Sequence, residues 1–110
     1  MTTRKKEVVQ VEDKRIHDYE LVFVISPEIV DESLEAAVDG VSKFITGKGG
    51  DVSEIERWGK KRLAYPLKRF SEGNYVLIRF KMNPEWSKEL ETSLKISEDI
   101  LRHLLINLSE

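Results

Sequence analysis

Three ranges of the chain alternate apolar and polar side chains with a period of two: residues 19–25, 74–82 and 100–108. This period is typical of β-strands that bury one face, so each range is a predicted strand. In the last of them Arg102 is the one charged residue on the more apolar face. We expect Arg102 to lie at the mouth of the buried layer.

A fourth predicted strand, residues 52–67, is longer and less regular. Gly59 interrupts its pattern, which favours a bulge or bend at that position. Pro66 has no N–H to donate, which favours a sheet edge or a strand end. The Ser-Glu-Gly-Asn sequence at residues 71–74 predicts the turn into the next strand.

Two further ranges repeat apolar residues at helical spacing. In the first, Leu34, Val38 and Ile45 share one face; Asp31 is the expected N-cap, and the glycines of residues 47–50 are the expected end. The second opens at residues 83–84, where Asn followed by Pro is typical of a helix start, and closes at residues 97–99.

The predicted order is strand, helix, strand, strand, helix, strand. Right-handed crossovers and a central hairpin fold this order into an α+β, ferredoxin-like βαββαβ sandwich, a four-stranded antiparallel sheet with two helices on one face. The other face stays open. Residues 1–18 are rich in charge and poor in apolar side chains, so we expect a flexible extension before one domain at residues 19–110.

Composition removes several classes of function. The chain has no cysteine, which excludes thiolate metal sites and fits a reducing compartment, and its apolar runs are too short for a membrane helix. His17 and His103 stand far apart without a paired acidic motif, and the glycine turn at residues 47–50 lacks the spacing of a phosphate-binding loop. We therefore expect a cytosolic protein that is not an enzyme, with no metal, cofactor, membrane or small-molecule substrate.

Charge is distributed very unevenly along the chain. Residues 57–69, RWGKKRLAYPLKR, hold six of the 18 Lys and Arg residues, two aromatic residues and no carboxylate, while the formal net charge of the chain is −2. We call this range the basic window. Most charged runs are only solvated surface, but cations along an extended strand can follow a phosphate backbone. The strand at residues 74–82 lacks the aromatic signature of an RNA recognition motif, so binding would depend on phosphates and shape.

The basic window also resembles a known family. Residues 58–68, with Gly, basic residues and Leu-Ala-Tyr-Pro, closely resemble the signature of the bacterial small-subunit ribosomal protein six family. Residues 19–23, 73–77 and 100–103 resemble its first, third and last strands, so the likeness covers about residues 18–108. Leu67 stands where the family commonly has isoleucine, and the extension before residue 18 is unusual.

This resemblance implies the same ferredoxin-like fold, no enzymatic activity and a place in the cytoplasmic ribosome. It also implies two partners: small-subunit ribosomal protein eighteen and the central domain of the small-subunit (16S) ribosomal RNA. The expected phosphate contacts, with Arg57 and Arg79 as the weaker candidates, are Arg57, Lys60, Lys61, Arg62, Lys68, Arg69 and Arg79. The expected protein-partner patch contains Trp58, Leu63 and Tyr65. The Trp58 ring could instead cover the core, and the Tyr65 ring could instead be buried or stack on a base, although base stacking is the less favoured alternative.

A second hypothesis is left open by the residues themselves. A ferredoxin-like regulatory or protein-interaction module could use its free sheet face for a protein or small-molecule partner, with the basic window serving solubility. RNA that co-purifies with the chain and is lost on charge reversal in the window would favour the first hypothesis.

Overall fold

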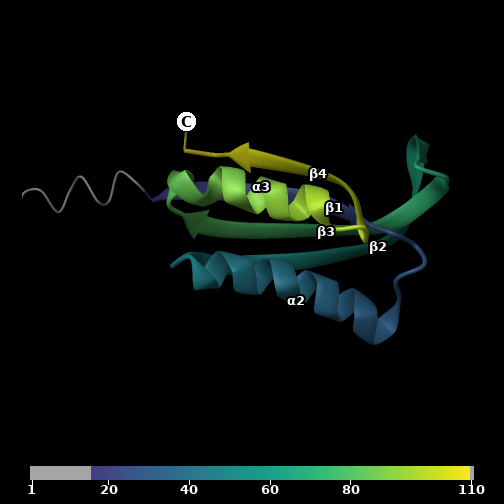
Figure 1. Ribbon diagram of the computed structural model, residues 1–110, viewed down its shortest axis with the longest axis horizontal. Coiled ribbons are helices and arrows are strands. Elements are labelled where there is room, and N and C mark those ends of the chain that lie inside the picture. Colours follow the sequence, from purple (N-terminus) through teal and green to yellow (C-terminus); the bar gives the residue numbers. More distant parts are fainter. Residues whose placement is uncertain (1–15, 110) are drawn as a thin grey trace, which may run out of the picture.

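The computed structural model describes residues 16–109, which form a four-stranded antiparallel sheet and two α-helices (Figure 1). The elements, in chain order, are β1 (His17–Ile25), α2 (Asp31–Gly47), β2 (Asp51–Leu67), β3 (Phe70–Met82), the 3₁₀ turn η1 (Pro84–Trp86), α3 (Ser87–Ile96) and β4 (Ile100–Asn107). The strand order across the sheet is β2-β3-β1-β4. The predicted ferredoxin-like sandwich is therefore confirmed.

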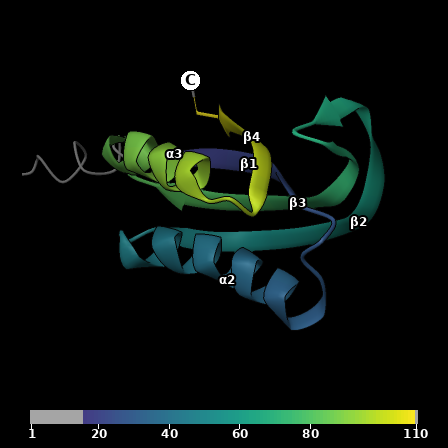
Figure 2. The same cartoon turned by 45° about the vertical axis from the view of Figure 1, so that its right-hand side comes forward.

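Both helices cover one face of the sheet, and the opposite face is left open (Figures 1 and 2). The hairpin of β2 and β3 is much longer than β1 and β4. Its far end extends past the helices, bends, and turns back toward β1 and β4, as Figure 2 shows. This bend gives the molecule two distinct parts, a layered sandwich and a projecting hairpin end.

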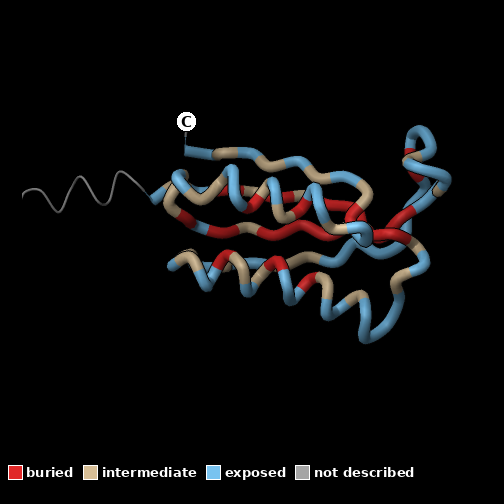
Figure 3. Tube along the Cα trace, in the orientation of Figure 1, coloured by how far each residue is buried: buried red, intermediate tan, exposed pale blue. Residues whose placement is uncertain are grey.

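The core lies between the helices and the inner face of the sheet, where the buried segments of Figure 3 are concentrated. Alternate residues of the two central strands supply most of it; Leu21, Phe23, Ile78 and Met82 are fully buried. Helix α3 contributes Leu90 and Leu94, one helical turn apart, and α2 contributes three buried residues. The apolar periods of the two central strands and of both helices therefore identify their part of the core correctly.

Local starts and stops of the elements partly differ from the expectations. Val30, and not Asp31, is the N-cap of α2, and no side chain caps that end; Asp31 itself has a positive φ of 53°. The predicted cap at Asn83 is confirmed, because its side chain accepts a hydrogen bond from the Glu85 amide, but it opens a 3₁₀ turn before α3. Strand β1 begins at His17, so His17 and Asp18, which were expected to belong to the flexible extension, are the first two residues of the sheet; residues 1–15 of that extension lie outside the described residues.

The turn of the central hairpin lies earlier than predicted. The chain reverses at residues 68–69, where Lys68 has a positive φ of 58°, and residues 71–74 already belong to β3. Gly73 is not a turn residue; it allows β3 to pass close to β1, since a Cβ there would clash with the Val24 Cγ1 atom. The bulge expected at Gly59 is confirmed by its φ of 83° and by a register shift beside it.

Strand β4 faces the opposite way to the expectation for most of its length. Ile100 pairs with Ile25 and is buried, but an irregularity follows, and Arg102 pairs with Val24. Arg102 and the alternate residues after it therefore lie on the open face, where Leu104 is 54% exposed. Within residues 16–109, neither helix has the length and apolar character required to cross a bilayer.

Candidate nucleic-acid interface

The basic window begins near the middle of β2 and ends in the hairpin turn, so its six cations lie at different positions along the projecting hairpin. Their surroundings separate them into two groups. Arg57, near the sandwich, has a short ion pair with a carboxylate of another element, whereas the five cations near the turn have none within the described residues, apart from a 3.7 Å contact of Arg69 with Glu28. The geometry of each group decides which charges remain for a ligand.

Arg57 belongs to the first group. Its Nε and Nη2 atoms donate to the two carboxylate oxygens of Glu35 on α2, at 2.8 and 2.7 Å. A fork-to-fork arrangement of this kind holds a guanidinium group in one direction. The charge of Arg57 is thus matched by the protein's own acid, on the helix side of the sheet.

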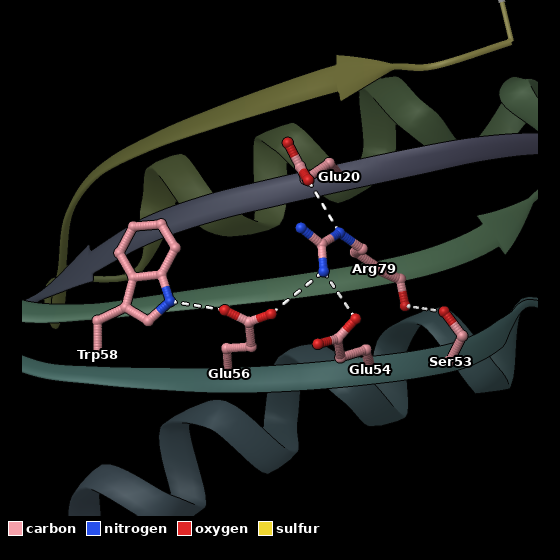
Figure 4. Close-up of polar contacts among 6 residues, drawn as sticks. All are labelled: Glu20, Ser53, Glu54, Glu56, Trp58 and Arg79. Carbon is pink, nitrogen blue, oxygen red and sulfur yellow. Dashed lines mark hydrogen bonds and ion pairs between the residues drawn. The ribbon is translucent and has the colours of Figure 1, made fainter.

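Arg79 lies on the open face of β3 and is held by three carboxylates (Figure 4). Its Nε atom lies 3.0 Å from Glu20 of β1, and its Nη1 atom lies 2.7 Å from Glu54 and 3.1 Å from Glu56 of β2. Hydrogen bonds to Glu54 and then Glu20 raise the pKa of Arg79 further above its usual value. We call Glu20, Glu54, Glu56 and Arg79 the acidic row; its formal charge of −2 repels phosphate.

Trp58 completes the row at its hairpin end. Its indole Nε1 atom donates to Glu56 at 2.8 Å, and this hydrogen bond is the largest cause that lowers the pKa of the Glu56 carboxyl. The ring also stacks on Tyr75, with centroids 6.4 Å apart and planes at 16°. Trp58 is 43% exposed, so it is a partly covered surface ring.

The second group of cations occupies the hairpin tip, which we define as residues 60–70. Lys60, Lys61, Arg62 and Lys68 are exposed and form no ion pair or side-chain hydrogen bond with any residue of the range 16–109. Arg69 stacks over the Phe70 ring at 4.8 Å and lies 3.7 Å from Glu28, an exposed and long contact that weakly offsets its charge. The tip thus carries five positive charges and no carboxylate.

An apolar hollow of about 190 Å³ lies between the hairpin tip and the open face of the sheet. Leu63 and Tyr65 of the tip form one wall, and residues of β1, β3 and β4 form the other. Leu63 is only 8% exposed, while Tyr65 is 55% exposed and its hydroxyl accepts a 2.7 Å hydrogen bond from Arg102. Trp58 stands beside this hollow through its contact with Tyr75, a lining residue.

Sequence reasoning did not select Tyr75 and the three glutamates of the acidic row. Tyr75 had a signal, its place on the mixed face of β3, but the pairing of Glu20 with Arg79 joins residues 59 positions apart and leaves no local pattern. In the described range, no group of three or more His, Asp or Glu side chains is arranged to hold a metal ion. The arrangement offers phosphate contacts at the tip and an apolar contact beneath it.

Comparisons with known proteins identify the family of this chain. The family model described as "Ribosomal protein S6" matches residues 18–107. The protein named "Small ribosomal subunit protein bS6" of Moorella thermoacetica is 44% identical over 95 residues, covering 86% of this chain and 97% of the relative. The protein of the same name from Dehalococcoides mccartyi strain CBDB1 is 38% identical over 104 residues, covering 94% of this chain and 95% of the relative.

A solved structure gives the same result for the fold. The crystal structure of 30S ribosomal protein S6 from Thermotoga maritima superposes with a TM-score of 0.79 at 31% sequence identity, covering 84% of this chain and 87% of that one. Members of this family are structural, non-enzymatic constituents of the cytoplasmic ribosome. The chain described here belongs to the ribosomal protein S6 family.

Proposed function

We propose that this protein binds 16S ribosomal RNA of the small subunit, in its central domain, through the hairpin tip, together with small-subunit ribosomal protein eighteen. The observation that supports this most directly is the set of cations at the tip that no described carboxylate neutralises. Lysines and arginines without a carboxylate partner neutralise phosphates on contact and release their bound counterions, and this release is the main source of nucleic-acid affinity.

The paired cations receive a different role in this proposal. Arg57 and Arg79 already satisfy carboxylates, so contact with a phosphate would require those ion pairs to break. We therefore assign the RNA contacts to Lys60, Lys61, Arg62, Lys68 and Arg69. Arg57 and Arg79 act within the fold, where they hold β2 against α2 and across the open face.

The open face suits the protein partner better than RNA. It combines exposed apolar residues, chiefly Leu104, with an acidic row of net charge −2, and an apolar hollow lies under the tip. A basic ribosomal protein segment complements this surface, while phosphate is repelled by it. Charge thus directs RNA to the tip and the protein partner to the open face.

The test of RNA binding compares two triple variants of equal charge. The first replaces Lys60, Lys61 and Arg62 by glutamine; the control replaces Lys43, Lys88 and Lys95, which are exposed residues of the two helices, away from the tip and the open face. With a central-domain 16S RNA fragment and protein eighteen present, the tip variant should bind about 100-fold more weakly near 0.1 M salt, and its log–log salt slope should fall by about 2 to 2.7. Equal binding by both variants would contradict RNA binding and favour a protein-interaction module.

The partner surface has a separate test. Replacement of Leu104 by glutamine should weaken the complex with protein eighteen and leave RNA binding by the isolated protein unchanged. Ile96 on α3 is a matched control, because it is 76% exposed but belongs to the helix layer. Isothermal titration of each variant with protein eighteen measures the difference; the same affinity for both variants would place the partner elsewhere.

A further inference from the structure

The hairpin tip is fixed to the far side of the sheet by one polar contact. Arg102 of β4 donates from its Nη1 atom to the Tyr65 hydroxyl at 2.7 Å, and its guanidinium carbon lies 5.9 Å from the centre of the Tyr65 ring. The two residues are 37 positions apart and come from the two opposite edge strands of the sheet. The contact therefore spans the open face above β3 and β1.

The sheet alone gives residues 63–66 of the tip little restraint. The β2–β3 register is broken between Arg62 and Leu67, so the four residues between them have no regular partner on β3. Leu63 is buried against the open face, but Tyr65 and its neighbours are exposed. Residues 63–66 are thus held over the sheet by the apolar contact of Leu63 and by the hydrogen bond between Arg102 and Tyr65.

This segment separates the tip cations into two sets. Lys60, Lys61 and Arg62 precede it, and Lys68 and Arg69 follow it. Arg62 and Leu67 are each paired with β3, so the three-dimensional spacing of the two sets depends on this pairing and on how the unpaired residues 63–66 are held. A phosphate backbone has fixed spacings, so cations arranged before binding lose less freedom when they bind.

We propose that Arg102 is a positioning residue: through Tyr65 it holds the two sets of tip cations in the arrangement that RNA recognises, without itself contacting RNA. This inference rests on the proposed RNA binding. It assigns to a residue of the last strand, outside the basic window, a role in ordering that window. It also explains why a charged residue lies within an otherwise apolar part of β4.

The main variant is Tyr65→Phe, which removes one hydroxyl and changes no charge. It should weaken RNA binding about three- to tenfold, while the salt slope stays that of the wild type because no phosphate contact is lost. Arg102→Lys keeps the charge but loses the planar fork, and should have a similar effect. The double variant Tyr65→Phe with Arg102→Lys should be no weaker than the weaker single variant, since both remove the same contact.

A second readout needs no RNA. The chain has no cysteine, so spin labels can be placed at Ser71→Cys near the tip and Lys88→Cys on α3, both exposed positions. The distance distribution measured by pulsed electron paramagnetic resonance should be narrow in the wild type and broader in the Tyr65→Phe variant. Thermal unfolding of the same samples checks that the sandwich is intact.

The possible outcomes separate this inference from the proposed function. Tyr65→Phe binding like the wild type, or an unchanged distance distribution, would overturn the positioning role even if the lysine variants lose RNA. A flatter salt slope in Arg102→Gln with no effect of Tyr65→Phe would show Arg102 on a phosphate, and would also overturn it. If all of the tip variants bound RNA as well as the wild type does, RNA binding by the tip itself would be refuted, whatever the spin labels report.

Discussion

The two ends of the β2–β3 hairpin use similar residues in opposite ways. Near the sandwich, Arg57 and Arg79 are each held by carboxylates from other elements, at 2.7 Å for the shortest contacts. At the tip, the neighbouring cations meet no carboxylate of the described chain at short range. Three positions along one strand, from Arg57 to Lys60, separate a cation that stabilises the fold from a cation that is left for a ligand.

The difference follows from what surrounds each end. The sandwich end has α2 on one side and β1 on the other, and both carry glutamates that reach β2 and β3. The tip extends past both helices (Figures 1 and 2), and the described carboxylates nearest to it are Glu72, the cross-strand neighbour of Arg62, and Glu28, 3.7 Å from Arg69. A protein that is acidic elsewhere can therefore keep a strongly positive surface simply by extending it beyond its own carboxylates.

The largest expected effect concerns stability. Phe80 is 2% exposed in the core under the helices, and its replacement by alanine should reduce the free energy of unfolding by about 3 to 5 kcal/mol. Tyr65→Ala at the tip removes an aromatic ring as well, but from an exposed position, and should cost less than about 1 kcal/mol. Urea unfolding followed by circular dichroism measures both; similar losses would mean that the tip shares the core's stability.

Backbone conformation gives the next effect. Gly59 has a φ of 83° at the bulge where the hairpin begins to project, so Gly59→Ala should cost about 1 to 2 kcal/mol. Gly40 lies within α2 with nothing near its added Cβ, and Gly40→Ala should stabilise the protein by up to about 1 kcal/mol. Opposite signs of the change in melting temperature would support this contrast between the projecting hairpin and the sandwich. An unchanged melting temperature in Gly59→Ala would argue against strain at the bulge.

Much of the sandwich end could be predicted from the sequence, because burial there leaves a period. Leu21 and Phe80 recur with their neighbours at the spacing of half-buried strands, and Leu90 and Leu94 at the spacing of a helix turn. The turn of the hairpin was misplaced because Gly73 looks like a turn residue, yet it is required where β3 passes close to Val24. A glycine required by a close approach of two strands and a glycine required by a turn look the same in the sequence, so the sequence could not distinguish them.

The site was predicted only in outline. The basic window identifies the projecting hairpin, since its charge is local in sequence. Whether each cation is free depends on acids that are far away in the chain, as Glu35 is from Arg57 and Glu20 is from Arg79. The face of Arg102 was also wrong, because one irregularity in the β1–β4 register reverses the alternation after Ile100.

A smaller effect tests the contrast between single charges. Lys60→Gln and Arg57→Gln each remove one positive charge from the same strand. Lys60→Gln should reduce RNA affinity about five- to eightfold near 0.1 M salt and lower the salt slope by about 0.7 to 0.9. Arg57→Gln should leave the slope unchanged, because that guanidinium group is already paired with Glu35. Equal slopes for the two variants, measured by fluorescence anisotropy over a salt series, would show that pairing within the fold does not decide which cations bind.

The smallest expected effect concerns pH and the acidic row of the open face. The hydrogen bond from the Trp58 indole, followed by contacts with Glu54 and Arg79, lowers the pKa of Glu56 below its usual 4.5. A carboxyl with a lowered pKa in the folded state stabilises the fold above its unfolded pKa, and that contribution is lost as the pH falls through the folded value. The contribution of this carboxyl can be removed in two ways: Trp58→Phe removes the indole donor and keeps the carboxylate, and Glu56→Gln removes the titrating group itself.

Both variants should therefore lose less stability than the wild type as the pH is lowered from about 5 to 3, with nearly parallel profiles above pH 6. Tip variants such as Lys60→Gln leave the acidic row intact and should follow the wild-type profile throughout. If Trp58→Phe instead tracked the wild type in acid, the indole would not be what lowers the Glu56 pKa, and Trp58 would be free to serve the partner surface alone.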